Sequence, residues 1–185
     1  MQTFLPYPRF ADSAKVLDYR RLGKQRVEAK QILIALGVAV GGHAGNAGSR
    51  WRRHPAVLMW KGFEHSLVEY SIEICREWRR RGFKDTLLEQ FERVPSHGSG
   101  RPSWLGCEPF HESHRSNLLR KDAEYYGRFG WATPHDLPYV WPPQGSANND
   151  GVDYRRLPWT PTAGLLGDLH PSAQEDAARA GRVAV

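Results

Sequence analysis

The most informative part of the chain is residues 18–36, which read DYRRLGKQRVEAKQILIAL. Together with the residues just before it, this stretch has the pattern of a helix, and it predicts one long helix over residues 11–36. Within this helix Gly23 is a candidate kink, and Gly37 is a candidate stop. The sequence therefore predicts that the chain is helical over most of its first 36 residues.

One face of this predicted helix is rich in cations and contains a single carboxylate. With about 100° of rotation per residue, the side chains on this face are Arg21, Lys24, Gln25 and Glu28, with Gln31 at its edge. Lys24 and Glu28 are four residues apart, a spacing that allows an ion pair worth only a few tenths of a kcal/mol. The face is therefore either a solvated helix surface or a binding and catalytic surface.

The composition sets the class of protein. The chain has 185 residues, of which 40% are hydrophobic, and seven tryptophans, so it can bury a sizeable core as one domain. Its net charge of +6 favours a polyanionic partner, such as nucleic acid. The sequence lacks a signal-peptide core and a run of about 18 apolar residues, which predicts a cytoplasmic protein that binds no membrane. The two cysteines, Cys75 and Cys107, form no disulfide framework and no Cys-x-x-Cys metal site.

Further helices are predicted along the chain. Pro55 suits the first turn of a second long helix, which ends in three arginines and Gly82. These arginines fit the role of helix-dipole partners better than that of ligands. Shorter helices are expected at residues 85–94 and from residue 110 onward. The polar, small-residue composition after Pro143 divides the chain into a domain at residues 1–143 and a linker with a loosely ordered extension at residues 144–185.

Two groups of residues downstream are candidates for ligand contact. His111 and His114 share a helix face, but no convincing third ligand accompanies them, so contact with DNA or a structural role is favoured over a metal. Arg115, with the neighbouring hydroxyls, offers donors for phosphate oxygens. The aromatic residues of segment 125–141 can either stack on bases or pack into the core.

Four pieces of the sequence, taken in order, resemble one known family. They are Leu17–Leu22, the helix from His54 to Phe83, the His111-Glu112 helix start and Tyr125–Gly127. Their order and approximate spacing through about residue 131 are similar to those of the pyrimidine-dimer DNA glycosylase family, the endonuclease V-like enzymes. The resemblance implies a compact, all-α, single-domain helical bundle. It also implies binding to duplex DNA, which is kinked so that a nucleotide is exposed at a lesion.

The resemblance further implies a mechanism. In this family an N-terminal α-amine attacks the sugar C1′, a glutamate assists, and strand scission follows by β-elimination. An α-amine has a pKa of about 8 and so offers more of the neutral nucleophile at physiological pH than an ordinary lysine, whose pKa is about 10.4. No metal or cofactor is implied.

At both catalytic positions the sequence departs from the family pattern. Arg21 stands where the family has its glutamate, and the large side chain of Gln2 predicts that Met1 is retained. The amine is then that of Met1. Glu28, two turns after Arg21, is either the replacement acid or an ion-pair partner of Arg21 or Lys24.

The resulting hypothesis is a metal-independent DNA glycosylase, with or without associated abasic-site (AP) lyase activity, that needs no protein partner. Met1 and Glu28 are the expected catalytic residues. The expected DNA contacts are Arg20, Arg21, Lys24, Gln25, Arg26, His54, His111, His114 and Arg115. Two alternatives remain open, a non-catalytic DNA-binding module on the same fold and an enzyme that acts on a modified nucleotide.

Overall fold

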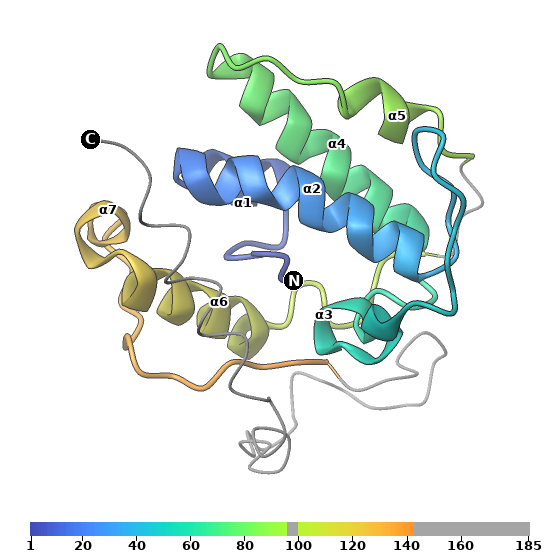
Figure 1. The fold of residues 1–185 in the computed structure, drawn as a ribbon. Helices are drawn as coiled ribbons and strands as arrows, with labels where there is room; N and C mark the ends of the chain where they lie inside the picture. The colour runs from blue at the N-terminus through green and yellow to red at the C-terminus, as the bar shows by residue number, and fades with distance from the viewer. Residues whose placement is uncertain (96–99, 143–185) are drawn as a thin grey trace, which may run out of the picture.

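The computed structural model describes residues 1–95 and 100–142, and in this part of the chain the regular secondary structure is helical (Figure 1). The elements are α1 (Phe10–Val16), α2 (Tyr19–Ala35), the 3₁₀ helix η1 (Arg50–Arg53), α3 (Pro55–Leu58), α4 (Glu64–Arg80), α5 (Leu88–Glu92), α6 (Glu108–Lys121) and α7 (Ala123–Gly127). No β-strand occurs among these residues, which confirms the predicted all-α fold. The predicted boundary between residues 143 and 144 lies outside the described residues.

The prediction of a single helix over residues 11–36 is wrong, because the chain breaks at Leu17 and Asp18. Leu17 adopts extended backbone angles, and the Asp18 carboxylate caps α2 by accepting hydrogen bonds from the backbone N–H groups of Arg20 (2.9 Å) and Arg21 (3.0 Å). Helix α2 continues through Gly23, where an added Cβ would lie 3.0 Å from the ring of Trp78. Gly23 therefore provides close packing against α4 rather than a kink.

The second predicted helix is also divided. A turn at residues 59–63, with Gly62 at a φ of +85°, separates α3 from α4. Because a residue with a side chain is strained at positive φ, the glycine permits this turn. The predicted stops are confirmed: Gly37 (φ +94°) follows the end of α2, and Gly82 (φ +86°) follows the end of α4.

The N-terminal segment runs through the interior of the fold. Thr3, Phe4 and Leu5 are at most 5% exposed, and Figure 1 places the N-terminus between α2 on one side and α6 and α3 on the other. The indole Nε1–H of Trp60 donates to the Thr3 hydroxyl (2.9 Å). A segment without secondary structure of its own is thus part of the core, where its backbone polar groups need partners.

Two histidines of α6 supply those partners. His111 Nε2 accepts from the Gly106 N–H (2.9 Å), so its Nδ1–H donates to the Leu5 carbonyl (2.7 Å). The Leu5 N–H in turn donates to His114 Nδ1 (3.0 Å), and Arg115 donates to the Pro6 carbonyl (2.8 Å). Burial lowers the pKa of both histidines, which keeps them neutral.

The prediction of DNA contacts for these three α6 residues therefore does not fit the structure. His111 and His114 are fully buried, and Arg115 is 9% exposed and also pairs with Glu108. Their hydrogen-bonding atoms are already used to fix the chain at Leu5 and Pro6. They hold the N-terminal segment in place, which is the structural role that the sequence left open.

The aromatic segment at residues 125–141 mostly packs against the protein. Tyr126 is fully buried, and its hydroxyl donates to Asp18 (2.6 Å). Trp131 stacks on Tyr126 and donates to the Tyr7 hydroxyl (2.7 Å), while the Tyr139 hydroxyl hydrogen-bonds His114. These rings therefore favour the core-packing alternative over base stacking. Within the described parts of the chain, no helix is both long and apolar enough to span a bilayer.

Arg81, just after α4, ties α4 to the end of α1. Its guanidinium donates to the carbonyls of Leu17 (2.6 Å), Ala14 (3.2 Å) and Lys15 (2.8 Å), and it pairs with the buried Glu77. The arginines at the end of α4 were predicted to be helix-dipole partners. Arg81 has this role, but toward the carbonyls at the C-terminal end of α1. Arg80, by contrast, pairs with Glu77 from an exposed position.

We expect Arg81→Met to lower the free energy of unfolding by about 2 kcal/mol and Tm by roughly 6 °C, because charged hydrogen bonds to buried carbonyls are lost. Arg80→Met is the matched control and should cost clearly less, since the Arg80 side chain is exposed to solvent. Thermal and urea unfolding of both variants measure the difference. Equal losses would mean that pairing with Glu77, and not the link to α1, provides the stability.

Candidate active site

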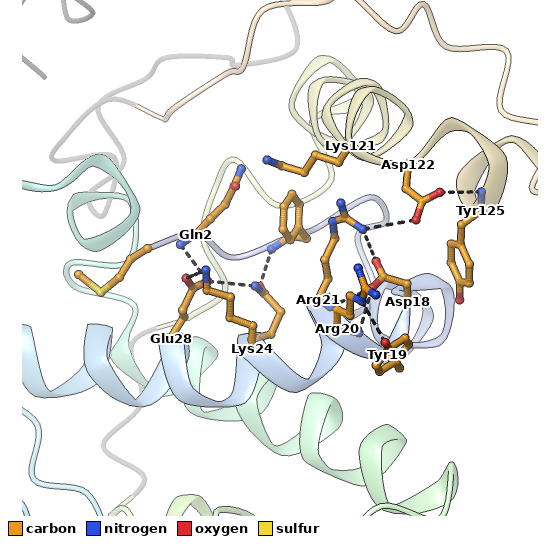
Figure 2. Close-up of a pocket in the computed structure, with 13 residues that line it drawn as sticks. Gln2, Asp18, Tyr19, Arg20, Arg21, Lys24, Glu28, Lys121, Asp122 and Tyr125 are labelled. Carbon is orange, nitrogen blue, oxygen red and sulfur yellow. Dashed lines mark hydrogen bonds and ion pairs between the residues drawn. The ribbon is translucent and has the colours of Figure 1, made fainter. Parts of the chain in front are cut away.

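A cavity of about 660 Å³ opens beside α2, where the N-terminus meets the junction of α6 and α7 (Figure 2). The residues that line it are Met1, Gln2, Phe4, Asp18, Tyr19, Arg20, Arg21, Lys24, Gln25, Glu28, Lys121, Asp122 and Tyr125. Six of the predicted site residues are in this set. They come from two parts of the sequence, the N-terminus and α2, which the fold brings together.

The N-terminus and Glu28 lie next to each other. The Gln2 backbone N–H donates to Glu28 Oε2 (3.3 Å), and Figure 2 shows this contact as a dashed line. The Glu28 side chain is only 11% exposed, although it also lies 3.7 Å from the Lys24 ammonium. The α-amine of Met1 is therefore one residue away from a largely buried carboxylate, in the same cavity.

His54 does not line the cavity, but it lies close enough to the N-terminus to respond to its charge. Burial, and then repulsion from the positively charged N-terminus, lowers the pKa of His54 to about 4. Its Nδ1 accepts from the Ala56 N–H (3.1 Å) at the start of α3, so the ring is neutral at pH 7. A neutral imidazole adds no second positive charge beside the amine.

Gln25 was predicted to contact DNA from the helix surface, but it is only 1% exposed. Its Oε1 accepts from the Phe4 N–H (2.8 Å) and from the Tyr70 hydroxyl (2.7 Å). Because both acceptor directions of the carbonyl oxygen are used, the amide NH₂ must point the other way, where it donates to Glu28 Oε2 (3.2 Å). Gln25, which lines the cavity, thus fixes the N-terminal segment and the Glu28 carboxylate relative to each other.

The outer part of the cavity carries positive charge. Arg20 is exposed and donates to the Tyr19 hydroxyl (2.9 Å), and the Lys24 side chain is 74% exposed. Lys121 enters from the end of α6, and burial, followed by the nearby charge of Arg21, lowers its pKa. Figure 2 shows these side chains around the cavity. An anionic ligand is favoured at such a rim.

Arg21 is held by acidic partners instead of being free. It donates to Asp18 (2.6 Å) and lies 4.0 Å from Asp122. Burial alone would raise the pKa of Asp18, but hydrogen bonds from Tyr126 and Arg21 bring it below its usual value. At the position of the family glutamate, this chain therefore has a guanidinium that is neutralised by a carboxylate on the same helix end.

Arg26, predicted as a DNA contact, faces away from the cavity. It pairs with the fully buried Asp85 carboxylate and stacks over the ring of Trp78 at 4.4 Å. Its side chain is 15% exposed, so it joins α2 to the segment that follows α4. The face predicted from helical geometry is correct for Arg21, Lys24 and Glu28, and Arg26 lies off that face.

The cavity is also lined by residues that were not predicted as site residues. Nothing in the local pattern of Lys121 and Asp122 separates them from other residues of a helix end, whereas Tyr125 belongs to the aromatic segment that was expected either to stack on bases or to pack into the core. They reach the cavity because α6 ends there. In the described part of the chain, no group of three or more His, Cys, Asp or Glu side chains is placed to hold a metal ion.

The chain was compared with known proteins. The model of the family described as pyrimidine dimer DNA glycosylase matches residues 1–90. No curated protein and no solved structure gives a significant match. The matched part includes the N-terminal segment, α2 and α4, and hence both Met1 and Glu28. By these residues, just under half of the chain, the protein is similar to the pyrimidine dimer DNA glycosylase family.

Proposed function

We propose that this protein excises a damaged or modified base from duplex DNA, with the α-amine of Met1 as nucleophile and Glu28 as the acidic group. The observation that carries the proposal is the hydrogen bond from Gln2 N–H to Glu28 Oε2, which keeps the terminal amine beside a carboxylate inside a basic cavity. The similarity of residues 1–90 to a DNA glycosylase family supports the same reaction.

The chemistry requires a neutral amine and a nearby carboxylate. The amine forms a bond to C1′ while the bond from C1′ to the base nitrogen breaks, and the base leaves with a proton. Opening of the sugar ring then gives an imine between Met1 and C1′. Glu28 stabilises the positive charge that builds on the sugar and accepts or donates protons in these steps.

Strand scission is the finer part of the proposal. Once the imine has formed, loss of a proton from C2′ allows β-elimination of the 3′ phosphate. Glu28 lines the cavity and accepts from the N–H of Gln2, the residue next to the amine, and it is the base we assign to this step. Hydrolysis of the imine then releases the protein.

The rim of the cavity suits the DNA backbone. Arg20, Lys24 and Lys121 surround the opening and provide charged donors for the phosphates on either side of the extruded nucleotide. Tyr19 is 54% exposed at the same rim and offers a ring for a base. A non-catalytic module would need these cations, but it would not need an amine held against a buried carboxylate.

Replacement of Glu28 by Gln tests the acid. We expect Glu28→Gln to slow base release or strand scission at least roughly a hundredfold, because a carboxylate opposite a developing cation is worth about 3 kcal/mol. DNA affinity should hold or rise, since a negative charge is removed near phosphates. Single-turnover rates, affinity and Tm are measured on one preparation, with Glu69→Gln on α4 as the control. A stable variant with an undiminished rate would exclude Glu28 as the acid.

Blocking the α-amine tests the nucleophile. We expect a Gly-Ser extension ahead of Met1 to abolish the borohydride-trapped complex with an abasic-site duplex, because the primary amine is moved away from Glu28. The same extension at the C-terminus is the control and should leave trapping unchanged. If trapping persists in the extended protein, the nucleophile is instead a lysine. Lys121 is then the first to replace by Arg, since it lines the cavity and its pKa is lowered.

A further inference from the structure

Outside the cavity, the 3₁₀ helix η1 presents a group of exposed cations and an exposed aromatic ring. It has the sequence Arg-Trp-Arg-Arg at residues 50–53, all four residues are exposed, and the Trp51 side chain is 54% exposed. Among the described residues, the three arginines of η1 form no ion pair with an acidic side chain, in contrast to Arg21, Arg26 and Arg81. Three unneutralised charges and an indole thus lie within a single turn.

The position of η1 is fixed rather than loose. The Ser49 hydroxyl accepts from the Trp51 N–H (3.2 Å), and the His54 N–H donates to the Trp51 carbonyl (2.8 Å). Just upstream, the Asn46 N–H donates to the Ile34 carbonyl (2.7 Å), which attaches the preceding loop to α2. The exposed indole is therefore held out on an anchored turn, and its exposure is a cost that a buried or polar residue would avoid.

Trp51 lies on the side of the cavity where the amine is. Its ring centroid is 5.8 Å from that of His54, and His54 is close enough to the N-terminal charge for its pKa to respond to it. Helix α3, which directly follows η1, lies next to the N-terminus in Figure 1. The surface thus continues from the amine across His54 to Trp51 and the arginines.

We propose that η1 is a second DNA-binding element, in which Trp51 stacks on the base next to the nucleotide in the cavity and the arginines contact the adjacent phosphates. This inference rests on the proposed function, because extrusion of a nucleotide is what leaves a neighbouring base with an unstacked face. An indole fits such a face, and its stacking is tolerant of sequence. Duplex DNA is favoured over a protein partner because the charge density of η1 complements a phosphate backbone.

The test uses binding without chemistry. The probe is a duplex with a tetrahydrofuran abasic analogue, which cannot form an imine, and with 2-aminopurine beside it to report stacking. Trp51→Ala should weaken affinity about tenfold and abolish the change in 2-aminopurine fluorescence on binding, while Trp51→Phe should retain most of both. Arg52→Gln with Arg53→Gln should reduce the slope of log affinity against log salt by about 2. The control pair Lys84→Gln with Arg93→Gln lies at the α4–α5 side and should change neither.

Unchanged affinity and fluorescence in Trp51→Ala would overturn the inference, and so would a lower Tm with unchanged DNA affinity, which would mean that the indole packs against the chain itself or a second copy. If these variants bind normally while borohydride trapping proceeds, only the role of η1 is wrong. If they lose affinity while the wild type traps no imine, the DNA surface stands and the glycosylase proposal is wrong.

Discussion

The hydrogen bonding of the buried N-terminal segment is the constraint on which the rest of the structure depends. An extended segment in a helical core has backbone groups that no helix satisfies, and here Leu5 is held by one histidine at its carbonyl and another at its N–H. Both imidazoles must be neutral and must have opposite tautomers for this to work, and burial lowers the pKa of each. Only with the segment fixed in this way does the α-amine have a defined place in the cavity.

Gln25 connects this constraint to the acid. A glutamine amide has one acceptor end and one donor end, so the two hydrogen bonds that it accepts, from Phe4 and Tyr70, decide where the donor end points. The donor end meets Glu28, and the same residue therefore orients the segment that carries the amine and the carboxylate that faces it. A reaction in which an amine attacks while a carboxylate assists requires both groups to be held in fixed positions. The proposed chemistry thus depends on a residue that is 1% exposed and whose hydrogen bonds all go to other protein groups.

Much of this arrangement was accessible from the sequence, and the rest was not, for physical reasons. Helical spacing places Arg21, Lys24 and Glu28 on one face, and the structure shows them lining the same cavity. The break at Asp18 was missed because an aspartate in a helical pattern is read as a polar surface residue unless its capping role is recognised. Burial of Gln25, His111 and His114 depends on contacts more than 20 residues away in sequence, which periodicity does not report.

The clamp on Leu5 also has a consequence for the order in which the site is made. The residues proposed for the chemistry, Met1 and Glu28, leave the ribosome first, but the hydrogen bond that seats the N-terminal segment joins Leu5 to His114, 109 residues later. Contacts of such long sequence separation form late, because the conformational entropy lost on closing a long loop must be offset by the contacts that it allows. A nascent chain that ends before α6 therefore carries the amine, the acid and Gln25, but not the two histidines that hold Leu5. In this protein the placement of the N-terminal segment is therefore completed only once α6 has been made.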